Sequence, residues 1–184
     1  MKAGVSIVML RTVCVSMAPH GLNPLARMTD PFDGLISFQR ALLDGEIKLQ
    51  AGALDPDLFV HADQPAPGVQ RLTYVRLDRQ SVVTALAMIV GTESIDGLRC
   101  FQVGVAVPEA YRGKGYAKSV VAAAIAELKY GLLRNKISSF YVEAIVSIDN
   151  EPSKRVAEAT ISATPVDVTD EVSGLPALHY VRKI

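Results

Sequence analysis

Residues 103–117 of the chain, VGVAVPEAYRGKGYA, decide the fold that we expect for the whole sequence. A run of apolar, β-prone residues ends at Pro108, and alanine-rich sequence typical of a helix begins at Tyr116. Gly113 and Gly115 stand between them, where glycine lets backbone N–H groups converge on one point without a Cβ atom in the way. The start of the helix adds unpaired N–H groups and the positive end of its dipole. The segment therefore predicts a site for a pyrophosphate-like anion.

Two glycines alone are also typical of a tight turn that carries a solvated Arg112 and Lys114. A dinucleotide-binding loop is less favoured, because the glycines lack the G-x-G-x-x-G spacing and the strands before the loop are expected to form a meander. If the anion site forms, Lys114 is expected to add charge to it.

The rest of the chain alternates between strand-like and helix-like stretches. Before the loop, turn residues separate three apolar runs, which indicates an antiparallel meander. After it, a helix between two strands indicates a parallel pair joined by a right-handed crossover. We expect strands at 71–77, 81–90, 100–107, 140–148, 166–169 and 177–182, and helices at 33–44, 116–133 and 152–160. The predicted fold class is α+β, with a single mixed, mostly antiparallel sheet flanked by helices.

Two stretches are less regular. Residues 52–68 contain three prolines and are expected to be mostly loop, with a short helix or strand near 58–61. Residues 1–27 have two interpretations, a first strand beginning near Val5 or an N-terminal extension ahead of a start at Met28. The apolar run is interrupted by Arg11 and is too short to span a bilayer, so neither a signal peptide nor a membrane anchor is expected. A single domain covering 1–184 is the expected organisation.

Composition limits the function classes. The 19 basic and 19 acidic side chains balance, which argues against a nucleic-acid-binding surface spread over the whole protein. Cys14 and Cys100 stand in apolar runs and indicate a reducing, cytoplasmic location. The three histidines, His20, His61 and His179, are scattered, so no metal site is expected.

The pattern V-x-V-P-x-x-x-R-G-K-G-x-A at 105–117 resembles motif A of the Gcn5-related N-acetyltransferases (GNAT), with Arg112, Gly115 and Ala117 at the signature positions. A second stretch, Glu143-Ala144 followed by Asn150-x-x-Ser153-x-x-Val156-Ala157-Glu158, is similar to motif B of the branch that includes the ribosomal-protein N-terminal acetyltransferases. The two motifs cover about a third of the chain, in the order and at the separation usual in that family. The resemblance implies the GNAT-type acyl-CoA N-acyltransferase fold.

The resemblance also implies acetyl-CoA as the cofactor. The backbone of the strand before the loop would pair with the pantetheine arm like an added strand, Asn150 would bond the same arm, and Ser153 would lie near the thiol. Asn150 is also a good helix cap, and capping alone is an open alternative. The implied cofactor-binding residues are Val105, Val107, Arg112, Gly113, Lys114, Gly115, Tyr116, Ala117, Asn150 and Ser153.

Two departures from the family pattern concern catalysis. The branch usually continues Glu-Lys-x-Gly-Phe after motif B, whereas residues 158–162 are EATIS. Many relatives have a tyrosine seven residues after the motif B asparagine, where it acts as the acid that protonates the leaving thiolate. That position is Ala157 here. The resemblance therefore supports cofactor binding more strongly than any catalytic residue.

The implied reaction is attack of a neutral amine on a thioester, which needs a base because most amines are protonated near pH 7. A backbone N–H at or beside Val105 is expected to stabilise the developing oxyanion. Glu143 is the expected base, since it stands in an apolar run where burial makes a carboxylate more basic. A structural carboxylate with a paired partner is the open alternative. Tyr141 and Tyr180 are the candidate acids, and Tyr141 is two residues from Glu143, on the same face of the sheet.

Two functions follow from the resemblance. The first is an N-acetyltransferase that moves an acetyl group from acetyl-CoA to a primary amine, on a protein N-terminus or a small molecule. The alternative is a catalytically weak or inactive module that binds acyl-CoA for sensing or partner contact. The expected partners are acyl-CoA and an amine acceptor, without nucleic acid or membrane, and a homodimer is one possible assembly. Residues 22–68 contain no charge cluster that identifies the acceptor.

Overall fold

The computed structural model describes residues 30–184. The predictions for 1–27, including the first strand, the start at Met28, Cys14 and His20, fall outside these residues. The elements follow in the order α1 (Pro31–Leu43), β1 (Gln50–Ala51), β2 (Leu58–Ala66), β3 (Val69–Leu77), β4 (Val83–Ile95), β5 (Leu98–Ala106), the short 3-10 helix η1 (Glu109–Tyr111), α2 (Tyr116–Arg134), β6 (Tyr141–Ser147), α3 (Glu151–Thr160), β7 (Val166–Thr169) and β8 (Pro176–Lys183).

The eight strands form one open sheet in the order β1-β2-β3-β4-β5-β6-β8-β7. Every neighbouring pair is antiparallel except β5 and β6, which are parallel and joined through α2. The predicted mixed, mostly antiparallel sheet and its parallel crossover are therefore confirmed. β7 and β8 form an antiparallel hairpin, and its second strand, β8, pairs with β6, which leaves β7 at the edge of the sheet.

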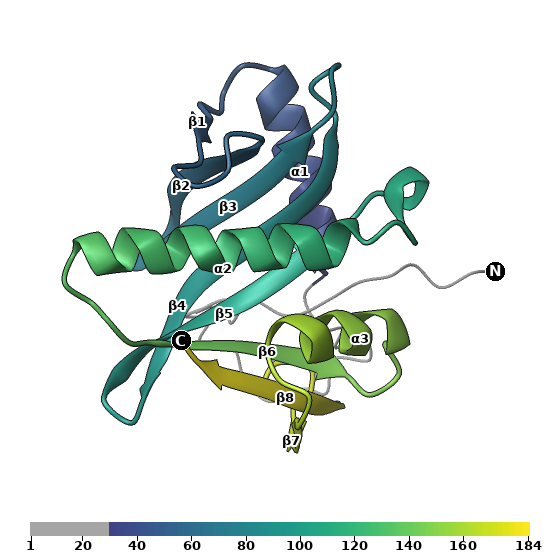
Figure 1. The fold of residues 1–184 in the computed structure, drawn as a ribbon. Coiled ribbons are helices and arrows are strands. Elements are labelled where there is room, and N and C mark those ends of the chain that lie inside the picture. Colours follow the sequence, from purple (N-terminus) through teal and green to yellow (C-terminus); the bar gives the residue numbers. More distant parts are fainter. Residues whose placement is uncertain (1–29) are drawn as a thin grey trace.

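Helices cover the sheet on both faces (Figure 1). α1 lies on one face, where Leu35 and Phe38 pack against Leu86 and Met88 of β4. α2 and α3 lie on the opposite face. Their apolar side chains share a single core with the inward side chains of the central strands, including Val120, Val121, Ala124, Val156, Ala157, Ala87, Ile89, Val103, Val105, Val142 and Ala144. None of the helices within 30–184 has the length and apolar composition needed to cross a bilayer.

Local capping explains where α1 and α3 begin. The Asp30 side chain accepts a hydrogen bond from the Phe32 N–H at 2.8 Å, and Pro31 occupies the first turn, where its missing N–H would have no partner. In the same way, Asn150 Oδ1 accepts the Ser153 N–H at 3.3 Å at the start of α3. α2 differs, because its N-cap is Gly115 and no side chain caps its first turn.

The prediction that residues 52–68 are mostly loop is wrong. Residues 58–66 form the full strand β2, which pairs with β3 along its length and turns at Pro67-Gly68. β1 pairs with β2 only opposite Phe59 and Val60, so most of the other edge of β2 has no strand partner. Pro65 lies within the irregular register at the end of that strand, where a missing N–H donor costs little.

The two parallel strands separate soon after they meet. β5 and β6 pair only at Cys100–Tyr141, Phe101–Val142 and Gln102–Glu143. From Val103 to Ala106, β5 continues to pair with β4 but no longer with β6. One edge of β5 is thus left without a strand partner at the end that leads into α2.

Candidate functional site

The loop that precedes α2 has the backbone conformation that the two glycines were predicted to allow. Gly113 and Gly115 have φ values of 73° and 81°, in the left-handed region that favours glycine. A Cβ atom added to either would meet no protein atom within 4 Å, so both face open space. Because no side chain caps α2, the first-turn N–H groups are available to an anion, as helix N-termini commonly are.

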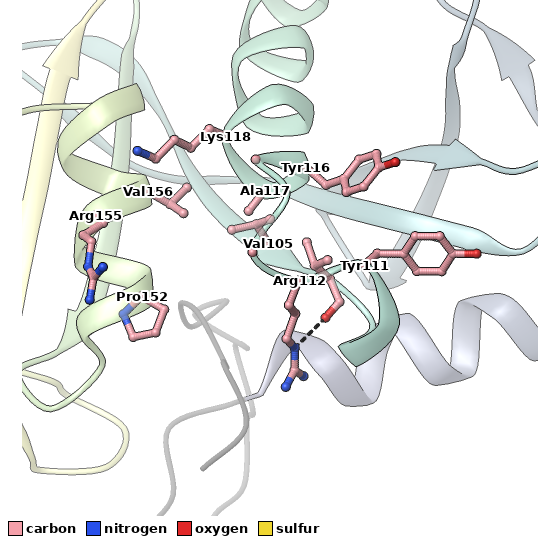
Figure 2. Close-up of a pocket in the computed structure, with 12 residues that line it drawn as sticks. Val105, Tyr111, Arg112, Tyr116, Ala117, Lys118, Pro152, Arg155 and Val156 are labelled. Carbon is pink, nitrogen blue, oxygen red and sulfur yellow. Dashed lines mark hydrogen bonds between the residues drawn. The ribbon is translucent and has the colours of Figure 1, made fainter. Parts of the chain in front are cut away.

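This open space is a pocket of about 400 Å³ between the end of β5, the start of α2 and the first turn of α3. Its size is within the range usual for small-molecule sites. Figure 2 shows α2 and α3 facing each other across it, with Val105 between them. The pocket is lined by Val105, Val107, Tyr111, Arg112, Gly113, Gly115, Tyr116, Ala117, Lys118, Pro152, Arg155 and Val156. Seven of the ten predicted cofactor-binding residues are in this set.

The charged residues that line the pocket are all basic. Its lining includes Arg112, Lys118 and Arg155 but no acidic residue. Arg112 is held in place, since its Nε donates to the Val107 carbonyl at 3.0 Å and its guanidinium lies over the Phe32 ring. The floor, by contrast, is apolar and includes Val105 and Val156. An anionic group with an apolar arm matches both parts.

Lys118 and Arg155 were not among the predicted binding residues. They come from α2 and α3, 37 positions apart in the chain, and Figure 2 shows them at the α2 and α3 sides of the pocket. A sequence signal did exist for Arg155, because Pro152, Arg155 and Val156 have the spacing of one helix face. Lys118 stands in the first turn of α2, three residues after Gly115.

Three predicted cofactor residues do not line the pocket. Lys114 Nζ donates to the Ala110 carbonyl at 3.0 Å and lies over the Tyr111 ring. The Asn150 side chain caps α3, which agrees with the alternative role considered for it. Ser153 is fully buried in the first turn of that helix.

Glu143 lies at the closed end of the gap between β5 and β6, in the last residue pair before the strands separate. Its side chain faces away from α2 and α3, because it alternates with Val142 and Ala144, which belong to the core under these helices. It is 7% exposed, and its Oε2 is 2.8 Å from His179 Nε2 on β8. The expected carboxylate therefore has a partner that the sequence did not indicate.

The structure does not bring Tyr141 to the pocket. Tyr141 pairs with Cys100, five residues before Val105, which along a strand is about 16 Å. Its hydroxyl donates to Asp96 Oδ2 at 2.8 Å in the turn between β4 and β5, and this bond raises the pKa of Tyr141. Burial raises the pKa of the free Cys100 thiol to about 11, which leaves that thiol protonated near neutral pH.

Position 157, where many GNAT enzymes have a tyrosine, is a buried alanine in the core. Tyr180 of β8 belongs to the same core, is fully buried, and its hydroxyl has no hydrogen-bond partner within the described residues. Burial, and then the nearby Glu158 and Glu151, raise the pKa of Tyr180, so it is a poor proton donor. Tyr180 is not among the residues that line the pocket.

Comparisons with solved structures identify the fold. The chain matches the apo form of RimL, a ribosomal L7/L12 α-N-protein acetyltransferase, with a TM-score of 0.50 and 13% identity over 76% of this chain and 97% of that one. It also matches a NatC complex bound to Gag peptide and CoA (TM-score 0.45, 16% identity, 61% of this chain and 70% of that one). A third match is a GNAT-family acetyltransferase from Bacillus anthracis (TM-score 0.41, 19% identity, 61% and 64%).

The chain thus has the GNAT acyl-CoA N-acyltransferase fold, as the motifs implied. It spans less than two thirds of the length of several matched structures, between 61% and 64%. No protein-family model matches the sequence, and no curated protein matches it significantly.

Proposed function

We propose that the chain is an acetyl-CoA-dependent N-acetyltransferase that acetylates a primary amine, and that residues 1–184 form one domain. The observation that carries this proposal is that one pocket contains both an anion site and the unpartnered edge of a strand. The glycine loop at the uncapped start of α2 supplies an anion site, and the unpartnered edge of β5 runs from there into the gap beside β6. A cofactor that joins a pyrophosphate to a peptide-like arm needs both.

The residues present fit that cofactor. Gly113 and Gly115 leave room where a Cβ atom would stand, and Arg112, Lys118 and Arg155 supply positive charge for phosphates. The edge of β5 at Val105, and the chain just beyond β5 at Val107, offer backbone groups to the amides of the arm, as in strand addition. When bound, acetyl-CoA supplies an acyl group activated as a thioester.

The gap between β5 and β6 also indicates from which face of the sheet the amine would approach. The pocket lies on the α2 and α3 face, whereas Glu143 faces the opposite side of the sheet at the closed end of the gap. An acyl group placed in the gap would therefore be reached by an amine from the α1 face. There, Glu143 would support removal of the amine proton, and a backbone N–H at or beside Val105 would stabilise the developing oxyanion.

The acceptor in this proposal is an amine on a protein N-terminus or on a small molecule. The protein N-terminus is included because the matched RimL structure is named as a ribosomal L7/L12 α-N-protein acetyltransferase. A module that binds acyl-CoA without turnover is the second candidate, and the observation that favours it is Ala157 in place of a tyrosine.

Calorimetry and thermal melting test the cofactor part of the proposal. Acetyl-CoA would bind the folded chain but not the unfolded chain, so a saturating concentration should raise the melting temperature. The expected stabilisation is about 2.7 kcal/mol at a ligand concentration of a hundred times the dissociation constant. Dephospho-acetyl-CoA and free pantetheine serve as partial ligands. Absence of any heat or melting shift with acetyl-CoA would contradict both candidate functions.

Thiol release from acetyl-CoA separates the two candidates. The full chain would be tested against peptide N-termini, lysine peptides, polyamines and aminoglycosides, with acetylated products identified by mass spectrometry. We expect turnover with at least one class. Tight binding without turnover in any class would favour the binding module.

A further inference from the structure

His179 and Glu143 form a side-chain pair across two neighbouring strands. Glu143 on β6 is opposite Val181 of β8, and His179 is opposite Ile145 of β6, so the two side chains are diagonal neighbours on one face. His179 Nε2 and Glu143 Oε2 are 2.8 Å apart. The carboxylate is almost buried, whereas 26% of the imidazole is exposed. In this pair, therefore, the histidine is the member that an incoming molecule can reach.

The pair stands where the proposed reaction needs a base. Gln102–Glu143 is the last pair of β5 and β6, and His179 is level with Ile145, two residues beyond it on the part of β6 that has left β5. It lies across β6 from the gap, on the face opposite the cofactor pocket. An amine that enters the gap from this face would approach the imidazole over β6.

On the basis of the proposed N-acetyltransferase function, we infer that His179 accepts the proton of the attacking amine and that Glu143 is the positioning residue that orients it. A carboxylate at Nε2 accepts the Nε2–H bond, which leaves the lone pair on Nδ1. As the amine nitrogen bonds the acyl carbon, its proton passes to Nδ1, directly or through one water. The C–S bond breaks with its electron pair on sulfur. The proton then leaves His179 for the thiolate or for solvent, so that an amide and a thiol are formed.

The chemistry of the two groups favours histidine as the acceptor. A neutral imidazole keeps a lone pair on one ring nitrogen and is the side chain most often used as a general base, whereas the Glu143 carboxylate already accepts the Nε2–H bond of His179. A negative charge at Glu143 stabilises the imidazolium that forms during the reaction. Glu143 thus contributes more by holding His179 than by meeting the amine itself.

The other titratable groups on this face of the neighbouring strands do not contact His179. On β6, Tyr141 donates to Asp96 in the turn between β4 and β5, and on β8 Lys183 lies over the Tyr141 ring. On β5, burial and then the nearby Glu143 raise the pKa of the Cys100 thiol, so the thiol is neutral. From β7, the residue opposite His179 is Val166, which carries no charge. Among the described charged groups on these strands, Glu143 is the one in contact with His179.

The test compares pH–rate profiles of His179→Gln, Glu143→Gln and the double variant, using an acceptor found in the panel above. His61→Gln is the matched control, because His61 lies on β2 and bonds the Lys48 carbonyl. We expect His179→Gln to lower kcat by roughly a hundredfold or more and to remove the acidic limb of the profile. Glu143→Gln should lower kcat less and should keep the acidic limb, because the imidazole remains but loses the carboxylate that orients it. The double variant should match His179→Gln.

Acetyl-CoA affinity and melting temperature, measured on every variant, exclude misfolding as the cause of lost activity. In the unmodified protein, the ring signals of His179 in NMR spectra should shift on acetyl-CoA binding. His179 is not the base if His179→Gln keeps the acidic limb, or if Glu143→Gln removes the limb while His179→Gln does not. In either case the proposed transferase function is unaffected. Binding without turnover for every acceptor would instead refute the transferase and this assignment with it.

Discussion

At the residue scale, Gly115 meets two requirements at once, a left-handed backbone and an unobstructed pocket wall. Valine at this position would adopt φ near 81° with strain of about 1–2 kcal/mol and would place its side chain in the open space of the pocket. We expect Gly115→Val to fold with a lowered melting temperature and to lose at least tenfold in acetyl-CoA affinity by calorimetry.

Gly97 provides the matched control. Its φ of 74° is similar, a Cβ atom there also meets nothing within 4 Å, and it lies in the turn between β4 and β5. Gly97→Val should show a similar loss of stability with normal affinity. Equal affinities in the two folded variants would show that the loop at 112–117 does not hold the cofactor.

At the element scale, α2 is tied to the chain before β2 by one carboxylate. Glu127 is 9% exposed and accepts N–H groups from Ala53, Leu54 and Asp55 at 3.1, 2.6 and 3.1 Å. The fit is tight, because a Cβ atom at Gly52 would come within 2.6 Å of Glu127 Oε1. The carboxylate thus fixes how far along the sheet α2 lies, and hence where its N-terminus meets the pocket.

Glu127→Gln should be clearly destabilising, because an amide replaces one acceptor oxygen with a donor that faces N–H groups. Leaving buried donors without acceptors costs roughly 1–3 kcal/mol. A loss of about 2 kcal/mol would lower the melting temperature of a chain of this size by about 4–8 °C. Glu158→Gln, on the exposed side of α3, is the control and should change stability little. Similar melting temperatures for both variants would mean that the loop does not depend on Glu127.

At the scale of the whole molecule, carboxylates with lowered pKa values make the free energy of unfolding depend on pH in the acidic range. A hydrogen bond from Arg76 lowers the pKa of Asp55, the Val82 N–H lowers that of Asp78, and Lys154 lowers that of Glu151. Each group binds protons more weakly in the folded chain than in the unfolded chain. Their stabilisation is therefore fully present above the ordinary values of 3.8 to 4.5 and is lost as the pH falls through the lowered ones.

Denaturant unfolding at pH 7, 4 and 3 measures this dependence. We expect the free energy of unfolding to fall mainly below pH 4, and to fall less steeply in Asp55→Asn, which no longer titrates at this site. A free energy of unfolding that stays constant from pH 7 to pH 3 would contradict the assigned shifts.

The sequence by itself determined the glycine loop, the helix that follows it and the parallel crossover to β6. These features depend on local rules, since the φ values that glycine allows, the period of apolar residues and the handedness of crossovers all act within one short stretch. Seven of the ten predicted cofactor residues line the pocket because they belong to that stretch or to the end of the strand before it.

The tertiary structure decided what depends on contacts between distant stretches. Pro65 is tolerated in β2 because the pairing of β2 with β3 is irregular between Asp63 and Ala66, which no local pattern reveals. Lys118 and Arg155 converge because α2 and α3 face each other across the pocket. Glu143 and His179, 36 residues apart, meet because β8 joins the sheet beside β6 and not beside β7 alone. Strand order in a sheet is set by the burial of whole faces, and single-sequence patterns record which residues are apolar but not which strands become neighbours.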